Sequence, residues 1–239
     1  MSRTYIHETL STQLDARLKE MGVSGYTIEN VSQVQDKNGE WKPIDSDKDP
    51  TVILIHYQSI LEDTINYIPP RVKIEISCLS MDEPTELRQI RSLIGKSFDG
   101  EDADAESLVR TVVPTRTFLE KLFLLAEEFQ KEKPRSVRMS RHLYDLERLM
   151  DTEYGTEALS NCKRYDAIVE HRKAYYALKY VNYDLHAPST INFTIPKSAM
   201  EAWQDDYADM RRFFIYGESL EFDALMQRMK ELQERVRIM

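Results

Sequence analysis

The stretch RTFLEKLFLLAEEFQK, residues 116–131, decides how the second half of the chain folds. Apolar side chains recur in it every three or four positions, which places them on one face of an amphipathic helix. These apolar residues are Phe118, Leu122, Leu125 and Phe129. Thr117 and Glu120 match a capping box, in which two side chains satisfy free amides at a helix start. The pattern predicts a helix over 116–131 that carries Lys121 near its first turn, where the helix dipole disfavours a cation.

The rest of the second half shows the same helical spacing. Further helices are predicted over 140–152, 163–180, 197–214 and 219–237. The last of these has an apolar seam that could pack within the chain or against a second copy. The seam residues are Leu225, Met229, Leu232 and Val236.

In the first half of the chain, the sequence predicts one helix followed by several strands. A helix is predicted over 6–21, ending at Gly22, and Asn38-Gly39 predicts a turn between paired strands. Runs rich in β-branched residues predict strands over 51–57 and 72–79. The sequence therefore predicts an α+β fold.

The segment SFDGEDADAE, residues 97–106, is acidic and rich in turn-forming residues. It separates the half with strands from the half with helices. We place a boundary there, with an α/β region over 1–100 and a helical region over 101–239.

Composition excludes several classes of protein. The chain has 239 residues and a formal net charge of −9, which argues against a protein that coats nucleic acid, although a local basic patch stays open. Its seven glycines form neither a GxGxxG nor a P-loop pattern. No apolar run approaches the length of a membrane span or resembles a signal peptide, so we expect a cytoplasmic protein without a membrane partner. Cys78 and Cys162 have no CxxC partners, which is typical of reduced thiols.

Glu75 is the most informative position of the first half. It lies between Ile74 and Ile76 in an apolar strand, so its side chain points to the opposite face. Two interpretations stay open. Glu75 either faces solvent on an antiparallel strand or serves as a metal-ligating carboxylate, since Mg²⁺ prefers hard oxygen ligands.

A basic cluster follows the helix that contains Lys121. It comprises Lys131, Lys133, Arg135, Arg138 and Arg141, against the single carboxylate Glu132. The cluster is either a solvated face or an anion site for a triphosphate or RNA, because arginine forks match phosphate oxygens. Arg141 and Asp145 stand four residues apart and could form a weak surface ion pair.

Other candidate sites have weaker support. The Asp-x-Asp spacings at 45–47 and 102–104 lie in polar, turn-rich segments without a flanking strand that would hold them rigid. The histidines show no HExxH spacing, and no GxSxG elbow is present.

Four strings resemble the bacterial AbiEii/AbiGii-type nucleotidyltransferase toxins of abortive-infection and toxin–antitoxin systems. They follow one another in family order along essentially the whole chain. The strings are YIPPRVKIEIS (67–77), PTRTFLEKLFLLAEEFQ (114–130), RMSRHLYDLERLMDTEYG (138–155) and IYGESLEFDALMQRMKELQ (215–233). The resemblance implies part of a nucleotidyltransferase-like mixed sheet followed by a mainly helical half.

The resemblance also implies roles for particular residues. Glu75 matches a strand carboxylate of the family, which gives it a catalytic and metal-binding role. Lys121 matches a lysine associated with nucleotide phosphates, and Asp145 matches an aspartate needed for activity. Arg138 and Arg141 match basic positions that face phosphates. Mg²⁺ and an NTP are the expected cofactor and substrate of the complete enzyme.

The family pattern departs from this chain at its start. The family opens with a GGT-type turn and a strand that carries a metal-binding Asp-x-Asp pair, and neither matches here. We therefore expect the chain to resemble the larger C-terminal portion of a member and to be inactive alone. The hypothesis is a nucleotidyltransferase-type toxin acting on an acceptor such as tRNA, with a cognate antitoxin. The alternative is a non-catalytic module that binds an antitoxin or RNA.

Overall fold

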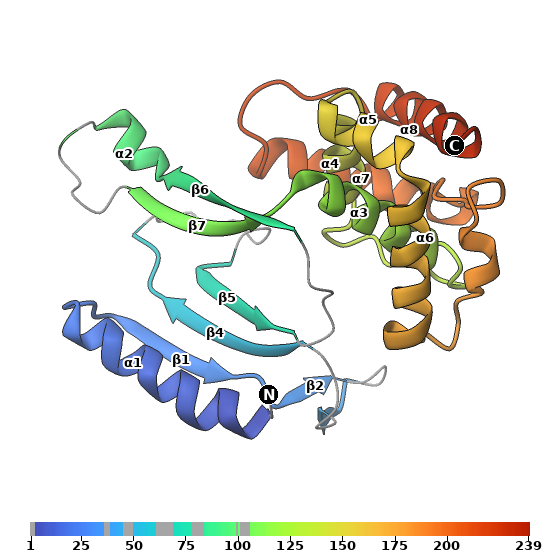
Figure 1. Ribbon diagram of the computed structural model, residues 1–239. Helices are drawn as coiled ribbons and strands as arrows, with labels where there is room; N and C mark the ends of the chain where they lie inside the picture. Colours follow the sequence, from blue (N-terminus) through green and yellow to red (C-terminus); the bar gives the residue numbers. More distant parts are fainter. Residues whose placement is uncertain are drawn as a thin grey trace. The chain divides into compact units, whose positions relative to one another are not determined.

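The computed structural model describes residues 3–35, 39–44, 50–60, 69–77, 84–98, 100 and 106–239. These residues divide into two compact units, Met1–Ser80 and Met81–Met239. We call them the N-terminal unit and the helical unit. The structure confirms the α+β class, because both helices and antiparallel strands are present (Figure 1).

The N-terminal unit begins with a helix. A π-helical turn, Tyr5–Leu10, runs directly into α1, Ser11–Glu20, which confirms the helix predicted over 6–21. The helix ends as expected at Gly22, whose φ of 75° suits glycine. The amide of Gly22 bonds to the carbonyl of Lys19 and that of Val23 to Leu18, which is a Schellman ending.

A three-stranded antiparallel sheet follows, in the order β1-β4-β5. Its strands are β1 (Tyr26–Asn30), β4 (Thr51–Tyr57) and β5 (Arg71–Ile76). Both predicted strand runs are thus present, and Cys78 and Leu79 lie outside the described residues. A separate pair joins β2 (Gln33–Gln35) to β3 (Trp41–Pro43), which confirms the pairing predicted around Asn38-Gly39. Residues 36–38 of that turn are not among those described.

The helical unit opens with a hairpin that the sequence analysis missed. Strand β6 (Thr85–Arg91) pairs with β7 (Glu106–Val112), and a short helix, α2 (Leu93–Ser97), follows β6 (Figure 1). Large apolar side chains on both strands stay exposed, so the hairpin has no buried stripe to mark it in the sequence. These exposed side chains are Leu87, Ile90, Leu108 and Val109.

Helix α3, Pro114–Glu128, forms the centre of the helical unit. It begins at Pro114, which stands at the first helical turn because it has no amide to leave unsatisfied. The predicted capping box is therefore wrong, since Thr117 and Glu120 lie inside the helix. Lys121 accordingly lies two turns into the helix and not near its start. The apolar face is fully buried, with Phe118, Leu122 and Leu125 at 0% exposure.

Further helices complete the described part of this unit (Figure 1). They are α4 (Arg141–Met150), α5 (Glu153–Ser160), α6 (Cys162–His171), α7 (Met200–Phe213) and α8 (Phe222–Arg237). The helix predicted over 163–180 stops early. After α6 comes a π-helical turn, Arg172–Tyr176, and Ala177 then adopts a left-handed conformation that ends it.

The remaining local features also bear on the predictions. The seam of α8 is at most 2% exposed, so it packs within the chain. Short 3₁₀ turns, Tyr183–His186 and Lys197–Ala199, precede α7. None of the described helices is both long enough and apolar enough to cross a bilayer.

Candidate functional site

Lys121 of α3 and Asp145 of α4 form an ion pair between two packed helices. The Lys121 Nζ lies 2.6 Å from the Asp145 Oδ2, and the side chains are 21% and 36% exposed. The structure thus joins two residues that the sequence predicted separately. Because both side chains retain contact with solvent, a ligand can reach them.

The sequence also suggests Arg141, four residues earlier on α4, as an ion-pair partner of Asp145. Arg141 is the exposed first residue of α4, and its guanidinium makes no ion pair with a carboxylate of the described residues. The expected surface pair is therefore replaced by the contact with Lys121 from another helix. Arg141 remains available to an anion that approaches this end of α4.

His142 lies buried in the first turn of α4, with 7% exposure. Burial lowers its pKa to about 3, and the positive charges of Lys121, Arg141 and Arg135 add to the effect. The imidazole is therefore neutral at physiological pH. These three cations therefore lie near the start of α4, where the helix dipole is positive as well, and the charge of Glu128 opposes their effect on the imidazole.

A strained turn leads into α4 and carries Arg138. The φ of Arg138 is 59°, a left-handed conformation that is uncommon for a residue other than glycine. The buried carboxylate of Asp206, on α7, holds this turn. It accepts bonds from the amides of Arg138 (2.5 Å) and Ser140 (3.0 Å) and from the Ser140 hydroxyl (2.5 Å). Asp206 therefore fixes where α4 begins and where Arg138 and Arg141 stand.

The basic cluster does not act as one face. Glu128, at the end of α3, is 2% exposed and accepts bonds from Lys131 (2.8 Å) and from the side chain and amide of Arg135. Burial by itself would raise the pKa of Glu128, but these donors hold it below its usual value. Lys131 and Arg135 thus serve a structural ion pair. Lys133, Arg138 and Arg141 are not part of that pair, and the phosphate-binding role of Arg138 and Arg141 stays a prediction.

Sequence reasoning missed a buried set of charges that joins α3 to the turn after α6, and we call it the Arg172 network. The Arg172 guanidinium binds Glu127 through Nε (2.7 Å) and Nη2 (2.5 Å) and also binds Glu120, which pairs with Arg116. Arg116, Glu127 and Arg172 are all at most 5% exposed. The available signal was the spacing of Arg116, Glu120 and Glu127, which puts three charges on the stripe of Phe123.

Glu75 lies on β5 in the N-terminal unit, and its side chain is half exposed. Its Oε1 is 2.7 Å from the Nζ of Lys73, and both side chains are 51% exposed. Ile74 and Ile76 point to the more buried face, as the alternation predicted. In the described residues no three metal-ligating side chains gather. A role of Glu75 as a metal ligand stays a prediction.

The acidic residues of both Asp-x-Asp spacings lie outside the described residues. They are Asp45, Asp47, Asp102 and Asp104. Of the two cysteines, Cys78 is likewise outside, and Cys162 is a free, exposed thiol.

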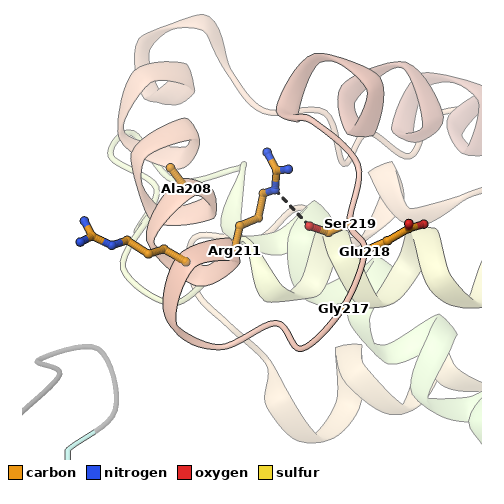
Figure 2. A pocket seen from close by; sticks show the side chains of 6 residues that line it. Ala208, Arg211, Gly217, Glu218 and Ser219 are labelled. Atoms are coloured by element: carbon orange, nitrogen blue, oxygen red, sulfur yellow. Dashed lines mark hydrogen bonds between the residues drawn. The ribbon is translucent and has the colours of Figure 1, made fainter.

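The described residues of the helical unit line pockets at two places relevant to a ligand. The first, about 600 Å³, is open and lies at the turn between α7 and α8. Figure 2 shows Arg211 directed across it toward Ser219, with the Nε donating to the Ser219 Oγ at 3.0 Å. The Arg211 guanidinium also donates to both carboxylate oxygens of Glu221, at 2.5 and 2.6 Å. It therefore binds the segment between α7 and α8 to α7. The second pocket, about 490 Å³, lies between α4, α7 and α8.

Residues 2–228 match the family model described as "Nucleotidyl transferase AbiEii toxin, Type IV TA system". The match spans both units, including α3 and α4. No match was found among curated proteins.

Proposed function

Because the chain belongs to the AbiEii family of nucleotidyl transferase toxins, we propose that it serves nucleotide transfer from an NTP to an acceptor such as tRNA. The family is that of type IV toxin–antitoxin systems, which implies an antitoxin as a partner. We propose the cytoplasm as its location, since NTPs and tRNA are found there.

The Lys121–Asp145 pair is the observation that carries this proposal. An ammonium group has three N–H donors, and Asp145 accepts one of them. Lys121 can therefore bind a phosphate oxygen while it keeps its bond to Asp145. Arg141, exposed one turn before Asp145, adds a second cation. Arg138 stands three residues before Arg141, in the turn that the Asp206 carboxylate holds.

Nucleotidyl transfer from an NTP proceeds by a single displacement at phosphorus. An acceptor hydroxyl oxygen attacks the α-phosphorus, the bond from this phosphorus to the bridging oxygen breaks, and pyrophosphate leaves. We assign the triphosphate charge to Lys121, Arg138 and Arg141, because fixed cations stabilise the negative charge of the transition state. Asp145 orients the attacking hydroxyl or accepts its proton.

Mg²⁺ is part of the family expectation, and Glu75 is the carboxylate that we assign to it. The described residues do not fit a metal site by themselves, since Glu75 is a single carboxylate already bonded to Lys73. Mg²⁺ prefers an octahedral shell of oxygen atoms. We therefore derive no step through the metal. Because no Asp-x-Asp pair stands within a strand pattern of the sequence, we also propose that the chain alone does not complete the transfer.

The test measures NTP binding and label transfer separately. The chain is titrated with each NTP in a calorimeter and is then incubated with the labelled NTP, Mg²⁺ and total tRNA. We expect binding of at least one NTP that Lys121→Ala weakens about tenfold, which corresponds to about 1.4 kcal/mol. Asp145→Asn should leave binding within about twofold, because the carboxylate acts on the acceptor and not on the triphosphate.

The outcomes separate the hypotheses. Absence of NTP binding, or binding that Lys121→Ala leaves unchanged, contradicts the proposal and favours a non-catalytic module that binds an antitoxin or RNA. Label transfer by the chain, abolished by both substitutions, would support the nucleotidyl transfer and overturn the expected inactivity of the chain alone.

A further inference from the structure

The pocket between α4, α7 and α8 is separate from the proposed nucleotide site. It has a volume of about 490 Å³, within the range of about 300–1,000 Å³ that is typical of small-ligand sites. Leu143 of α4 contributes to its wall, whereas Asp145 lies two residues further on the same helix. Residues two apart on a helix do not face each other. The pocket and the Lys121–Asp145 pair thus lie on different sides of α4.

The floor of the pocket is apolar. Buried side chains from α4, from the segment before α7 and from α8 form it, namely Leu143, Phe193, Ile195, Phe222 and Met229. Two half-buried methionines, Met200 and Met226, also line the pocket. Methionine side chains are flexible and adapt to ligands of irregular shape. The floor therefore suits an apolar group of a ligand.

The rim of the pocket carries two lysines, Lys197 and Lys230, and one acid, Asp223. All three are exposed. Neither lysine forms an ion pair with a carboxylate of the described residues, in a chain whose net charge is −9. An excess of unpaired positive charge beside an apolar floor is complementary to an anion attached to an apolar body.

We propose that this pocket binds an amphipathic organic anion, a molecule of the medium-chain carboxylate class. The apolar chain lies on the floor beside Met200 and Met226, and the carboxylate lies between the ammonium groups of Lys197 and Lys230. Since α4 carries both Leu143 and Asp145, an occupied pocket also restrains the helix that bears the proposed nucleotide site. This inference goes beyond the proposed function and does not depend on it.

The test is a binding measurement on the whole chain without nucleotide. The fluorescence of 8-anilino-1-naphthalenesulfonate reports occupancy, and decanoate or decyltrimethylammonium is added as competitor below its micelle concentration. We expect decanoate to displace the probe about tenfold more effectively than the cation of equal chain length. The double variant Lys197→Glu/Lys230→Glu should remove this preference, and Met226→Trp should abolish binding of the probe by filling the pocket.

The controls keep the proposal falsifiable. Lys163→Glu removes an exposed lysine of α6 outside the pocket and should change nothing. Thermal melting followed by circular dichroism confirms that each variant folds, and Lys197→Gln/Lys230→Gln replaces the charge reversal if that variant does not. Equal displacement by both head groups, or an anion preference that survives loss of both lysines, overturns the proposal. So does Met226→Trp binding the probe like the unaltered chain.

Discussion

Glu120 and Lys121 are neighbours on α3, yet they belong to two ion-pair systems of different character. Glu120 joins the Arg172 network, in which the 5% exposed side chain of Arg172 binds two carboxylates. Lys121 joins Asp145 in a pair that remains partly exposed. Successive residues of a helix point about 100° apart, so one helix serves both systems. The difference teaches that a fully bonded buried network holds the fold, whereas an open pair can accept a ligand.

The largest effect on stability should come from disrupting the buried Arg172 network. Arg172→Met leaves Glu127 buried without its bidentate partner, and we expect the free energy of unfolding to fall by about 3–5 kcal/mol. Urea unfolding followed by circular dichroism measures it. Arg164→Met is the matched control, because its pair with Glu157 is 31% and 49% exposed, and it should cost less than about 1 kcal/mol. Equal losses in the two variants would show that the network is not structural.

The next effect concerns the clamp that positions α4. Asp206→Ala removes the acceptor of three hydrogen bonds and leaves the amide of Ser140 buried without a partner. We expect a loss of about 2–3 kcal/mol by urea unfolding. Asp206→Asn retains one carbonyl acceptor and should recover part of the loss. If Asp206→Ala matched the unaltered chain in stability, the clamp would not hold the turn of Arg138.

A smaller effect should appear in how the stability of the chain depends on pH, through His142 near the Lys121–Asp145 pair. The pKa of the His142 imidazole is about 3 in the folded chain, against an ordinary value of 6.5. Between pH 6.5 and about pH 3, the imidazole therefore binds a proton only in the unfolded chain. Stability should therefore fall as the pH falls below 6.5, by at most about 1.4 kcal/mol per pH unit from this group. His142→Asn should remove that part of the slope between pH 6.5 and 4.5. Identical slopes in both proteins would contradict a buried, neutral imidazole.

The smallest effect on stability should come from the open pair itself. Lys121→Ala breaks a partly exposed ion pair, which contributes about 0–1 kcal/mol. Its effect should instead appear in NTP binding, as proposed above. Glu120→Gln, the neighbouring change, should show the reverse order, with a clear loss of stability and unchanged NTP affinity. A large unfolding effect of Lys121→Ala would remove the distinction between the two systems.

Local patterns predicted most of the helices and the strands of the N-terminal unit, because apolar spacing and turn residues mark them directly. The α8 seam and the ending at Gly22 are examples. The β6–β7 hairpin escaped prediction, since its apolar side chains are exposed and show no buried face. The capping-box pattern at Thr117 and Glu120 predicts too late a start for α3. The helix begins at Pro114 instead, because the fixed φ of proline suits the first helical turn.

The sequence could suggest candidate site residues but not their contacts. The resemblance predicts roles for Lys121 and Asp145, while the distance of 2.6 Å between them depends on how α3 and α4 pack. Asp206 could not be found from the sequence, because it acts on a turn 66 and 68 residues away. The roles of Glu75, Arg138 and Arg141 stay predictions until ligand binding is measured.

The Asp206 clamp also has a consequence for the order of folding. The turn at Arg138 acquires its acceptor only after α7 has been synthesised and has docked, and closing a loop of that length carries an entropic cost before any contact forms. During synthesis, α3 can form locally as soon as its own residues have emerged. The start of α4, with Arg138 and Arg141, is therefore among the last parts of this unit to reach its final geometry.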